Sequence, residues 1–154
     1  LYSSAASDVY KRQLFLLVFK YAGLYWYFVW CTVLVVNVVN LDEKFGLIKD
    51  LHSYKVVAQM NDYYFKLVKA KRDFVWHQHP ETDEVFMVIE GTLTIELRDK
   101  TLTLNKNELV VIPKGVEHKP SCTQQCHVML IEPKTTLNTG NTQNKLTDTK
   151  LQWI

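Results

Sequence analysis

The stretch WHQHPETDEVFMVIEG, residues 76–91, contains two histidines one residue apart, followed five residues later by a glutamate. Residues i and i+2 of a strand point to the same face, so His77 and His79 are expected to lie side by side. Two neighbouring imidazoles repel each other when both are protonated, and they rarely fill an apolar core. They are compatible when both are neutral and share a metal ion. The stretch therefore indicates a metal site.

Two further side chains are candidate ligands of the same ion. Glu84 follows His79 after Pro-Glu-Thr-Asp, which is enough for a tight turn that brings the next strand alongside. His118 ends the segment PKGVEH, residues 113–118, where we expect a turn. Three imidazoles and one carboxylate leave two open positions on an octahedral divalent ion. Such a set suits iron(II), manganese, nickel or zinc.

The chain from residue 54 onward has the pattern of short strands separated by turns. In TLTIELR, residues 92–98, alternation places Leu93, Ile95 and Leu97 on the inward face. After a short helix or loop within residues 41–54, the expected strands cover residues 54–60, 63–70, 84–90, 92–98, 101–104, 109–112 and 126–132. Many short strands spaced by turns are typical of an all-β sandwich or small barrel.

The two candidate ligand segments resemble the two motifs of the cupin superfamily. The matching positions are His77, His79, Glu84 and Gly91 in the first motif, and Pro113, Gly115 and His118 in the second. The resemblance covers about residues 54–133, and it is closest to small single-domain bacterial cupins labelled mannose-6-phosphate isomerase-like. It implies a jelly-roll β-barrel in which the metal ligands are His77, His79, Glu84 and His118. Where the family often has a glycine, this chain has Asn107, which also tolerates left-handed backbone.

The segments outside the expected barrel have a different composition. Residues 3–13, SSAASDVYKRQ, match the translation of a transposase adapter used in sequencing libraries, so residues 1–13 are interpreted as an adapter scar. Residues 14–39 carry one charge in 26 residues and are interpreted as upstream read-through, with a membrane anchor as the alternative. The barrel is then assigned to residues 40–133. A polar tail, residues 134–154, is expected to run over the surface, with Trp153 and Ile154 available to dock.

The distribution of charge gives no sign of a nucleic-acid surface. The formal net charge is +2, but the part of the chain from residue 40 onward has 15 basic and 15 acidic side chains. The three cysteines, Cys31, Cys122 and Cys126, are expected to be reduced thiols in a cytoplasmic protein. A membrane would be a partner only if residues 14–39 belong to the natural protein.

These features predict a metal-binding cupin that takes a small polar molecule and forms a homodimer. One interpretation is a metal-dependent isomerase or dioxygenase, and the alternative is a non-catalytic metal- or ligand-binding module. No catalytic residue is assigned, because no Glu, Tyr or Lys beyond the ligand set is evidently directed into the pocket. Phe86 and Val88 share the face of Glu84 and are expected to form the floor of the pocket. His127, which opens the last strong strand, is expected at the rim of the barrel.

Overall fold

The computed structural model describes residues 11–16, 29–34 and 36–154, which belong to two compact units, residues 1–38 and 39–154. In the first unit, β1 (Lys11–Leu16) pairs antiparallel with β2 (Val29–Leu34). Within the apolar segment, residues 14–16 and 29–34 therefore belong to strands, and residues 36–39 have no regular secondary structure. No helix among the described residues is long and apolar enough to cross a membrane. Residues 1–10 of the proposed adapter scar and residues 17–28 and 35 of the apolar segment lie outside the described residues, so both interpretations stay predictions.

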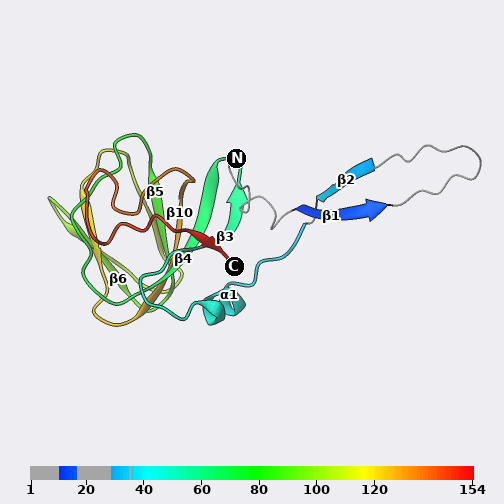
Figure 1. The fold of residues 1–154 in the computed structure, drawn as a ribbon. Helices are drawn as coiled ribbons and strands as arrows, with labels where there is room; N and C mark the ends of the chain where they lie inside the picture. The colour runs from blue at the N-terminus through cyan, green and yellow to red at the C-terminus, as the bar shows by residue number, and fades with distance from the viewer. Residues whose placement is uncertain (1–10, 17–28, 35) are drawn as a thin grey trace, which may run out of the picture. The chain divides into compact units, whose positions relative to one another are not determined.

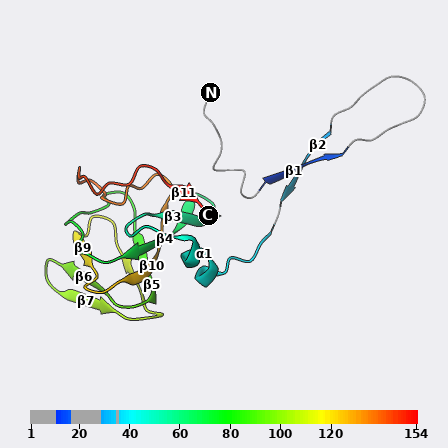
Figure 2. The same ribbon diagram turned by 60° about the horizontal axis from the view of Figure 1, so that its bottom comes forward.

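The second unit contains two β-sheets that face each other as a barrel (Figures 1 and 2). The larger sheet has six strands in the order β11-β3-β4-β10-β5-β8, and the smaller has three in the order β7-β6-β9. The bounds are β3 Lys55–Met60, β4 Tyr63–Ala70, β5 Glu84–Glu90, β6 Leu93–Leu97, β7 Thr101–Leu104, β8 Leu109–Ile112, β9 His118–Ser121, β10 Cys126–Pro133 and β11 Gln152–Trp153. This confirms the predicted all-β jelly-roll architecture.

Each predicted strand coincides with an observed strand to within one residue at either end. Two turn residues explain part of this agreement, because Asn61 and Asn107 adopt positive φ angles of 53° and 68°. Asparagine is one of the few residues other than glycine that adopt this conformation readily. Strand β9 was not predicted, since it lies where we expected a turn and contains Pro120. It forms through its pairing with β6, a long-range contact without a local sequence signal.

The short helix α1 (Leu41–Leu47) precedes the barrel strands, as predicted. The Asn40 side chain accepts a hydrogen bond from the backbone N–H of Glu43 at 3.2 Å and so caps the first turn. Phe45 and Ile48 are buried in a cluster with Val57 and Leu67 from the larger sheet. The helix therefore packs its apolar face on the outside of the barrel.

His127 lies beneath this helix rather than at the barrel rim. Its ring stacks on Phe45 with a centroid distance of 4.5 Å, and its Nδ1 lies 3.1 Å from Glu90 Oε2. Met129, two residues along β10, packs on the same helix-facing cluster. The prediction that His127 lies at the rim is therefore wrong. His127 and Met129 are on the face of β10 that α1 covers, whereas the residues between them point into the barrel.

The barrel interior is filled by alternate residues of each strand. On β5 the buried residues are Glu84, Phe86 and Val88, and on β10 they alternate from Cys126 to Glu132. The strands are antiparallel, with Phe86 opposite Leu130. Glu84 begins β5 and Glu132 lies near the end of β10, so this register brings both carboxylates to the same end of the barrel. The positions that continue the alternation toward the other end are apolar.

The C-terminal tail is packed more deeply than the sequence suggested. Thr139 is fully buried, and Asn141 donates its backbone N–H to the carbonyl oxygen of Gln78 at 3.1 Å. The end of the tail docks as predicted, because β11 pairs in parallel with β3 and Ile154 packs on the helix-facing cluster. The tail therefore contacts the segment that carries the two neighbouring histidines.

Cys122 and Cys126 form a disulfide across the short connection between β9 and β10, with their Cα atoms 6.3 Å apart. The prediction of reduced thiols is therefore wrong for this pair. The sequence spacing alone did not reveal the bond. It becomes possible because the ends of two strands that belong to different sheets approach each other here.

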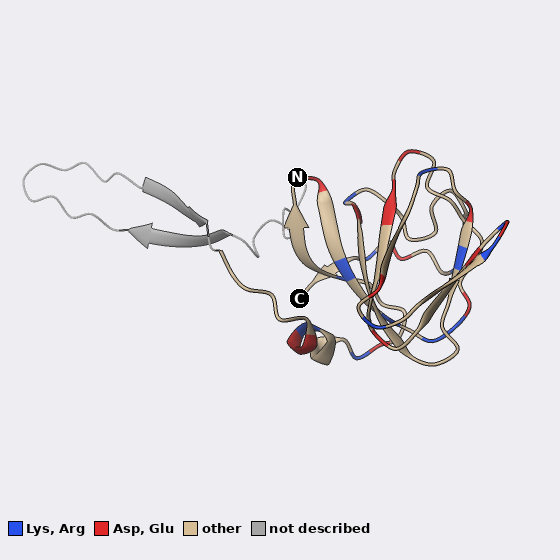
Figure 3. Cartoon of the chain, turned by 180° about the vertical axis from the view of Figure 1, so that it is seen from behind, with Lys and Arg blue, Asp and Glu red and all other residues tan. Residues whose placement is uncertain are grey.

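Lysine and arginine are interspersed with aspartate and glutamate along the ribbon of residues 39–154 (Figure 3). Exposed pairs such as Arg98 with Glu117, at 2.9 Å, join charges of opposite sign. The equal numbers of basic and acidic residues counted from the sequence are therefore also mixed locally on the structure.

Candidate metal centre

The four predicted ligands meet at one end of the barrel interior. One donor atom from each of His77, His79, Glu84 and His118 lies within 4.8 Å of the other three. All four side chains are buried, with at most 5% of any residue exposed. Three imidazoles and a carboxylate can together surround a single ion at this spacing.

Backbone pairing brings the two motifs together. The backbone N–H of His77 donates to the carbonyl oxygen of His118 at 3.0 Å, and the reverse hydrogen bond is 2.9 Å long. His118 begins β9, and Glu84 begins β5. Gly115, at a φ of 75°, donates its backbone N–H to the carbonyl oxygen of His79 at 2.9 Å. The turn before β9 is thus fixed directly on the two-histidine segment.

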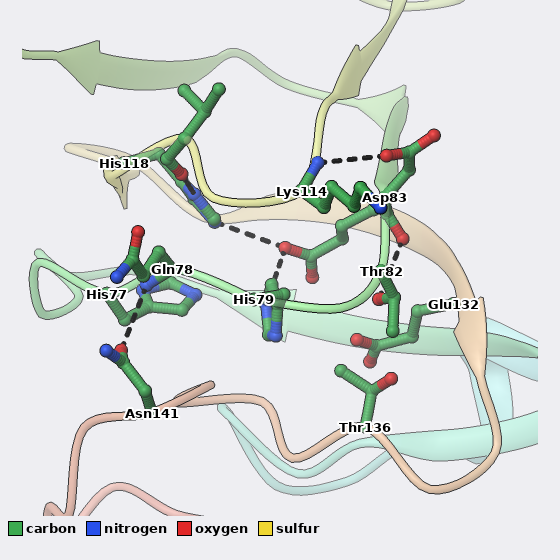
Figure 4. Close-up of polar contacts among 12 residues, drawn as sticks. His77, Gln78, His79, Thr82, Asp83, Lys114, His118, Glu132, Thr136 and Asn141 are labelled. Atoms are coloured by element: carbon green, nitrogen blue, oxygen red, sulfur yellow. Dashed lines mark hydrogen bonds and ion pairs between the residues drawn. The ribbon is translucent and has the colours of Figure 1, made fainter.

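The turn also receives a side-chain contact. Asp83 Oδ1 accepts a hydrogen bond from the backbone N–H of Lys114 at 2.9 Å (Figure 4). Asp83 and Glu81 are both exposed, as expected for turn residues beside Glu84. Asp83 therefore positions the loop next to the site, whereas its neighbour Glu84 points into it.

Hydrogen bonds define which nitrogen of two ligand histidines faces the site. Nδ1 of His77 lies 2.9 Å from the carbonyl oxygen of Val75, and Nδ1 of His118 lies 3.0 Å from that of Val116. A carbonyl oxygen can only accept, so both Nδ1 atoms carry the proton. Nε2 of each ring then faces the site and offers its lone pair to a metal when the ring is neutral, the arrangement that commonly orients metal-binding histidines.

The Glu84 carboxylate lies between Nε2 of His118 and Nε2 of His79. Its Oε2 is 3.1 Å from His118 Nε2 and 3.1 Å from His79 Nε2 (Figure 4). Burial raises the pKa of Glu84, but the hydrogen bonds and charges of His118 and His79 outweigh burial and lower it to about 2. Glu84 is therefore a carboxylate at neutral pH, which is the form that binds a cation.

The histidines at positions 77 and 79 have opposite pKa shifts. Burial, followed by the charge of His118, lowers the pKa of His77 to about 4, so its imidazole is neutral. Burial also lowers the pKa of His79, but Glu84 raises it more, and the net shift is upward. In the metal-free protein the carboxylate of Glu84 thus favours a proton on His79 more than burial opposes it. A metal ion would take the place of that proton.

Lys66 and Glu132 lie beside the four ligands, and the sequence analysis missed both. Lys66 Nζ is 2.9 Å from Glu132 Oε1, and the two residues are 1% and 0% exposed. Burial and then the charge of Glu84 raise the pKa of Glu132, Lys66 opposes the rise, and the net result is a pKa of about 7. The missed signal was the inward alternation of β10, which reaches Glu132 after Val128 and Leu130.

A groove leads from the surface to the ligand set. It has a volume of about 250 Å³ and is lined by the turn at residues 79–82 and by Thr135, Thr136, Leu137 and Gly140 of the tail. His79 is the metal-ligand candidate that reaches this groove. Phe86 and Val88, which we expected at the floor of the pocket, do not line this groove; they lie in the main core, where a second cavity of about 40 Å³ is lined in part by Phe86. A small ligand therefore has space on the side of His79.

Comparison with known proteins agrees with this fold and site. The family model for the cupin domain matches residues 64–132. The chain is 55% identical to a cupin-2 domain containing protein from Shewanella frigidimarina NCIMB 400, over 63% of this chain and 95% of that chain, with a TM-score of 0.62. It is 29% identical to protein NMB1881 from Neisseria meningitidis, over 64% of this chain and 100% of that chain, with a TM-score of 0.58.

One curated relative matches over a shorter stretch. The uncharacterized protein YdbB of Bacillus subtilis (strain 168) is 37% identical over 73 residues, which is 47% of this chain and 65% of YdbB. The fold and site define a small β-barrel protein with a buried group of three histidines and one glutamate that could bind a metal. By its similarity to the Shewanella protein and to the family model, the chain belongs to the cupin family.

The residues present fit a divalent transition metal. The buried Nε2 of His77 has no hydrogen-bond partner, and Nε2 of His79 faces Glu84 Oε2 at 3.1 Å without a well-formed hydrogen bond. Unpartnered buried nitrogens are unfavourable, and a metal ion at this position would satisfy both. Nitrogen and carboxylate donors suit iron(II), manganese, nickel and zinc alike.

Proposed function

We propose that this cupin binds one divalent transition metal through His77, His79, Glu84 and His118 and uses it to hold a small polar molecule. The observation that supports this proposal most strongly is the buried Nε2 of His77, which has no hydrogen-bond partner. It lies beside a carboxylate whose pKa is lowered, in a site that backbone hydrogen bonds hold in shape. Holding these polar groups together in the interior lowers the stability of the metal-free fold, and binding of a metal would offset that loss.

The chain contributes binding, orientation and exclusion of water. His77 and His118 are oriented by backbone carbonyl groups, and Phe86 packs against the His118 ring at a centroid distance of 5.8 Å. A bound divalent ion would act as a Lewis acid on ligand oxygens, or as an oxygen-activating centre if it is iron(II). Four protein ligands leave two positions of an octahedral ion for a substrate. We propose a metal-dependent isomerase or dioxygenase on this basis.

The test of metal binding is elemental mass spectrometry on the full chain purified without added metal or chelator. We expect about one transition metal per chain, and loss of at least about 100-fold in affinity for a His77→Ala/His79→Ala variant. The matched control is His127→Ala, because His127 lies on the outer face beneath α1 and should not affect metal content. A protein that takes up none of iron, manganese, nickel or zinc would refute the proposal.

Turnover distinguishes an enzyme from a non-catalytic binding module. The resemblance to cupins labelled mannose-6-phosphate isomerase-like makes aldose–ketose isomerisation the first reaction to assay, and oxygen consumption the second. We expect activity in the metal-loaded protein and none in the chelated protein. If the metal and a small ligand bind without turnover in either assay, the binding-module alternative is favoured.

A homodimer and a cytoplasmic location are also part of this proposal. Light scattering on the purified chain tests the first, with an expected mass of twice 18.0 kDa. The Cys122–Cys126 disulfide bears on the second, because disulfides usually persist in oxidising compartments. Thiol labelling of extracts made under acid quench tests the location: the pair found oxidised would count against a cytoplasmic location, and the pair found reduced would support it.

A further inference from the structure

Two oxygen atoms beside the metal centre have no partner within the protein. Glu132 Oε2 is buried and accepts no hydrogen bond, and Thr136 Oγ1 is buried and makes none. Glu132 as a whole is 0% exposed. An unsatisfied carboxylate oxygen in a barrel interior is costly, and a buried ion pair can often be replaced by apolar residues without loss of stability. The stability of the fold therefore does not explain why these two oxygen atoms are buried without partners.

The rest of this group is fully engaged. Lys66 Nζ donates to Glu132 Oε1 at 2.9 Å and to the carbonyl oxygen of Thr136 at 3.3 Å. These contacts fix one oxygen of the Glu132 carboxylate and place the other toward the site. In Figure 4 the carboxylate of Glu132 is directed toward His79, and Thr136 lies on the same side. Thr136 also lines the groove that reaches His79.

From this geometry we infer that Glu132 Oε2 and Thr136 Oγ1 form a subsite that accepts the hydroxyl group of a metal-bound α-hydroxy carboxylate. The inference rests on the proposed metal site and specifies its ligand class. A carboxylate without a partner requires a donor, and a hydroxyl group next to a metal-binding oxygen supplies one. At pH 8, above the pKa of Glu132 of about 7, the ion pair of Lys66 and Glu132 is neutral, so a divalent ion with Glu84 leaves one net positive charge. That charge matches a ligand with a single carboxylate.

The test compares lactate with propionate, which differ by one hydroxyl group. Both are titrated into the cobalt(II)-loaded full chain, and binding is followed by the visible absorption of the ion. Lactate can chelate the cobalt ion through its hydroxyl group, so it should bind more tightly than propionate even without the subsite. The deciding quantity is therefore the change in the lactate-to-propionate affinity ratio between the wild type and Glu132→Gln. With Lys66 holding the amide oxygen, glutamine presents an N–H donor in place of Oε2. We expect the ratio to fall by about tenfold or more.

A second variant keeps the inference testable if Glu132→Gln does not fold. Thr136→Val removes the hydroxyl with little change of shape, and we expect the ratio to fall by about three- to fivefold because a neutral hydrogen bond is weaker. The matched controls are Glu90→Gln and Thr103→Val, both exposed and remote from the site, which should leave the ratio unchanged.

Metal content, measured on every sample, distinguishes the failure of this inference from the failure of the proposed function. If cobalt binds to the wild type and to Glu132→Gln, but the ratio is the same in both, the subsite is refuted and the metal site stands. If the wild type takes up no cobalt, both are refuted together. A ratio that falls equally in the control variants would also refute the subsite.

Discussion

The two ends of the barrel interior are built from the same strands but from opposite kinds of side chain. At the apolar end, β5 and β10 contribute Phe86, Val88, Val128 and Leu130 to the main core. At the polar end, continuing the same alternation, they contribute Glu84 and Glu132. The buried ionisable residues of the polar end are Lys66, His77, His79, Glu84, His118 and Glu132.

This difference separates stability from function within one barrel. Apolar side chains gain free energy when they are buried, at about 25 cal/mol per Å² of area removed from water. Buried charges lose hydration and recover it only through good partners. At the polar end several atoms lack such partners, so this end is the less stable part of the interior and the part with capacity to bind.

The largest expected effect comes from breaking the buried ion pair. Lys66→Met leaves the Glu132 carboxylate without its partner, and we expect the free energy of unfolding to fall by about 3–5 kcal/mol. The double variant Lys66→Met/Glu132→Leu should regain most of this loss, since it converts part of the polar end into apolar core. Urea unfolding of the metal-free protein at pH 8 measures both. A Lys66→Met variant as stable as the wild type would contradict the view that the polar end depends on paired buried charges.

Leu130→Ala tests the apolar end of the same strand. Leu130 is 3% exposed, so its truncation leaves a cavity, and we expect a loss of about 2–5 kcal/mol in the free energy of unfolding. Metal content should stay at the wild-type value, because the ligands lie at the other end. The control is Leu109→Ala on β8, where the side chain is 58% exposed and the change should stay within about 0.5 kcal/mol. Loss of metal in Leu130→Ala would show that the ends are not independent.

The pH dependence of stability should reveal the cost of burying His77 at the polar end. Its pKa is lowered in the folded protein to about 4 from 6.5. The unfolded chain therefore binds more protons between these values, and the stability due to neutral His77 is present above pH 6.5 and lost as pH falls toward 4. We expect the metal-free wild type to lose up to about 3 kcal/mol more over this range than His77→Gln. Parallel pH profiles of the two proteins would contradict this shift.

The smallest effect is expected where the tail covers the polar end. Gly140 has a φ of 53°, and a Cβ atom there would clash with the backbone carbonyl oxygen of Gln78. Gly140→Ala must displace the tail from the histidine segment, and we expect it to cost about 1–3 kcal/mol. Gly46→Ala is the matched control, because a Cβ atom there meets nothing within 4 Å and alanine favours the helix. Thermal unfolding compares them, and equal midpoints would mean that the tail is not held there.

Local features of the sequence determined much of this protein. Period-two alternation located the strands of residues 92–98 and 101–104, because each strand buries one face. The spacing of His77 and His79 implied a shared face, and the two motifs implied Glu84 and His118 as partners. Asn107 was expected to replace a glycine in a turn, and its positive φ confirms this. Each of these features depends on residues close together in the chain.

Only the tertiary structure decided the remaining features, because each depends on how distant strands are paired. Leu130 lies opposite Lys66 on one neighbouring strand and opposite Phe86 on the other, and this register brings the Lys66–Glu132 pair beside Glu84. The side of β10 covered by α1 decided that His127 faces outward. The meeting of β9 and β10 permitted the Cys122–Cys126 disulfide. A shift of one residue in any such pairing would turn these side chains to the opposite face, and local spacing carries no information about that choice.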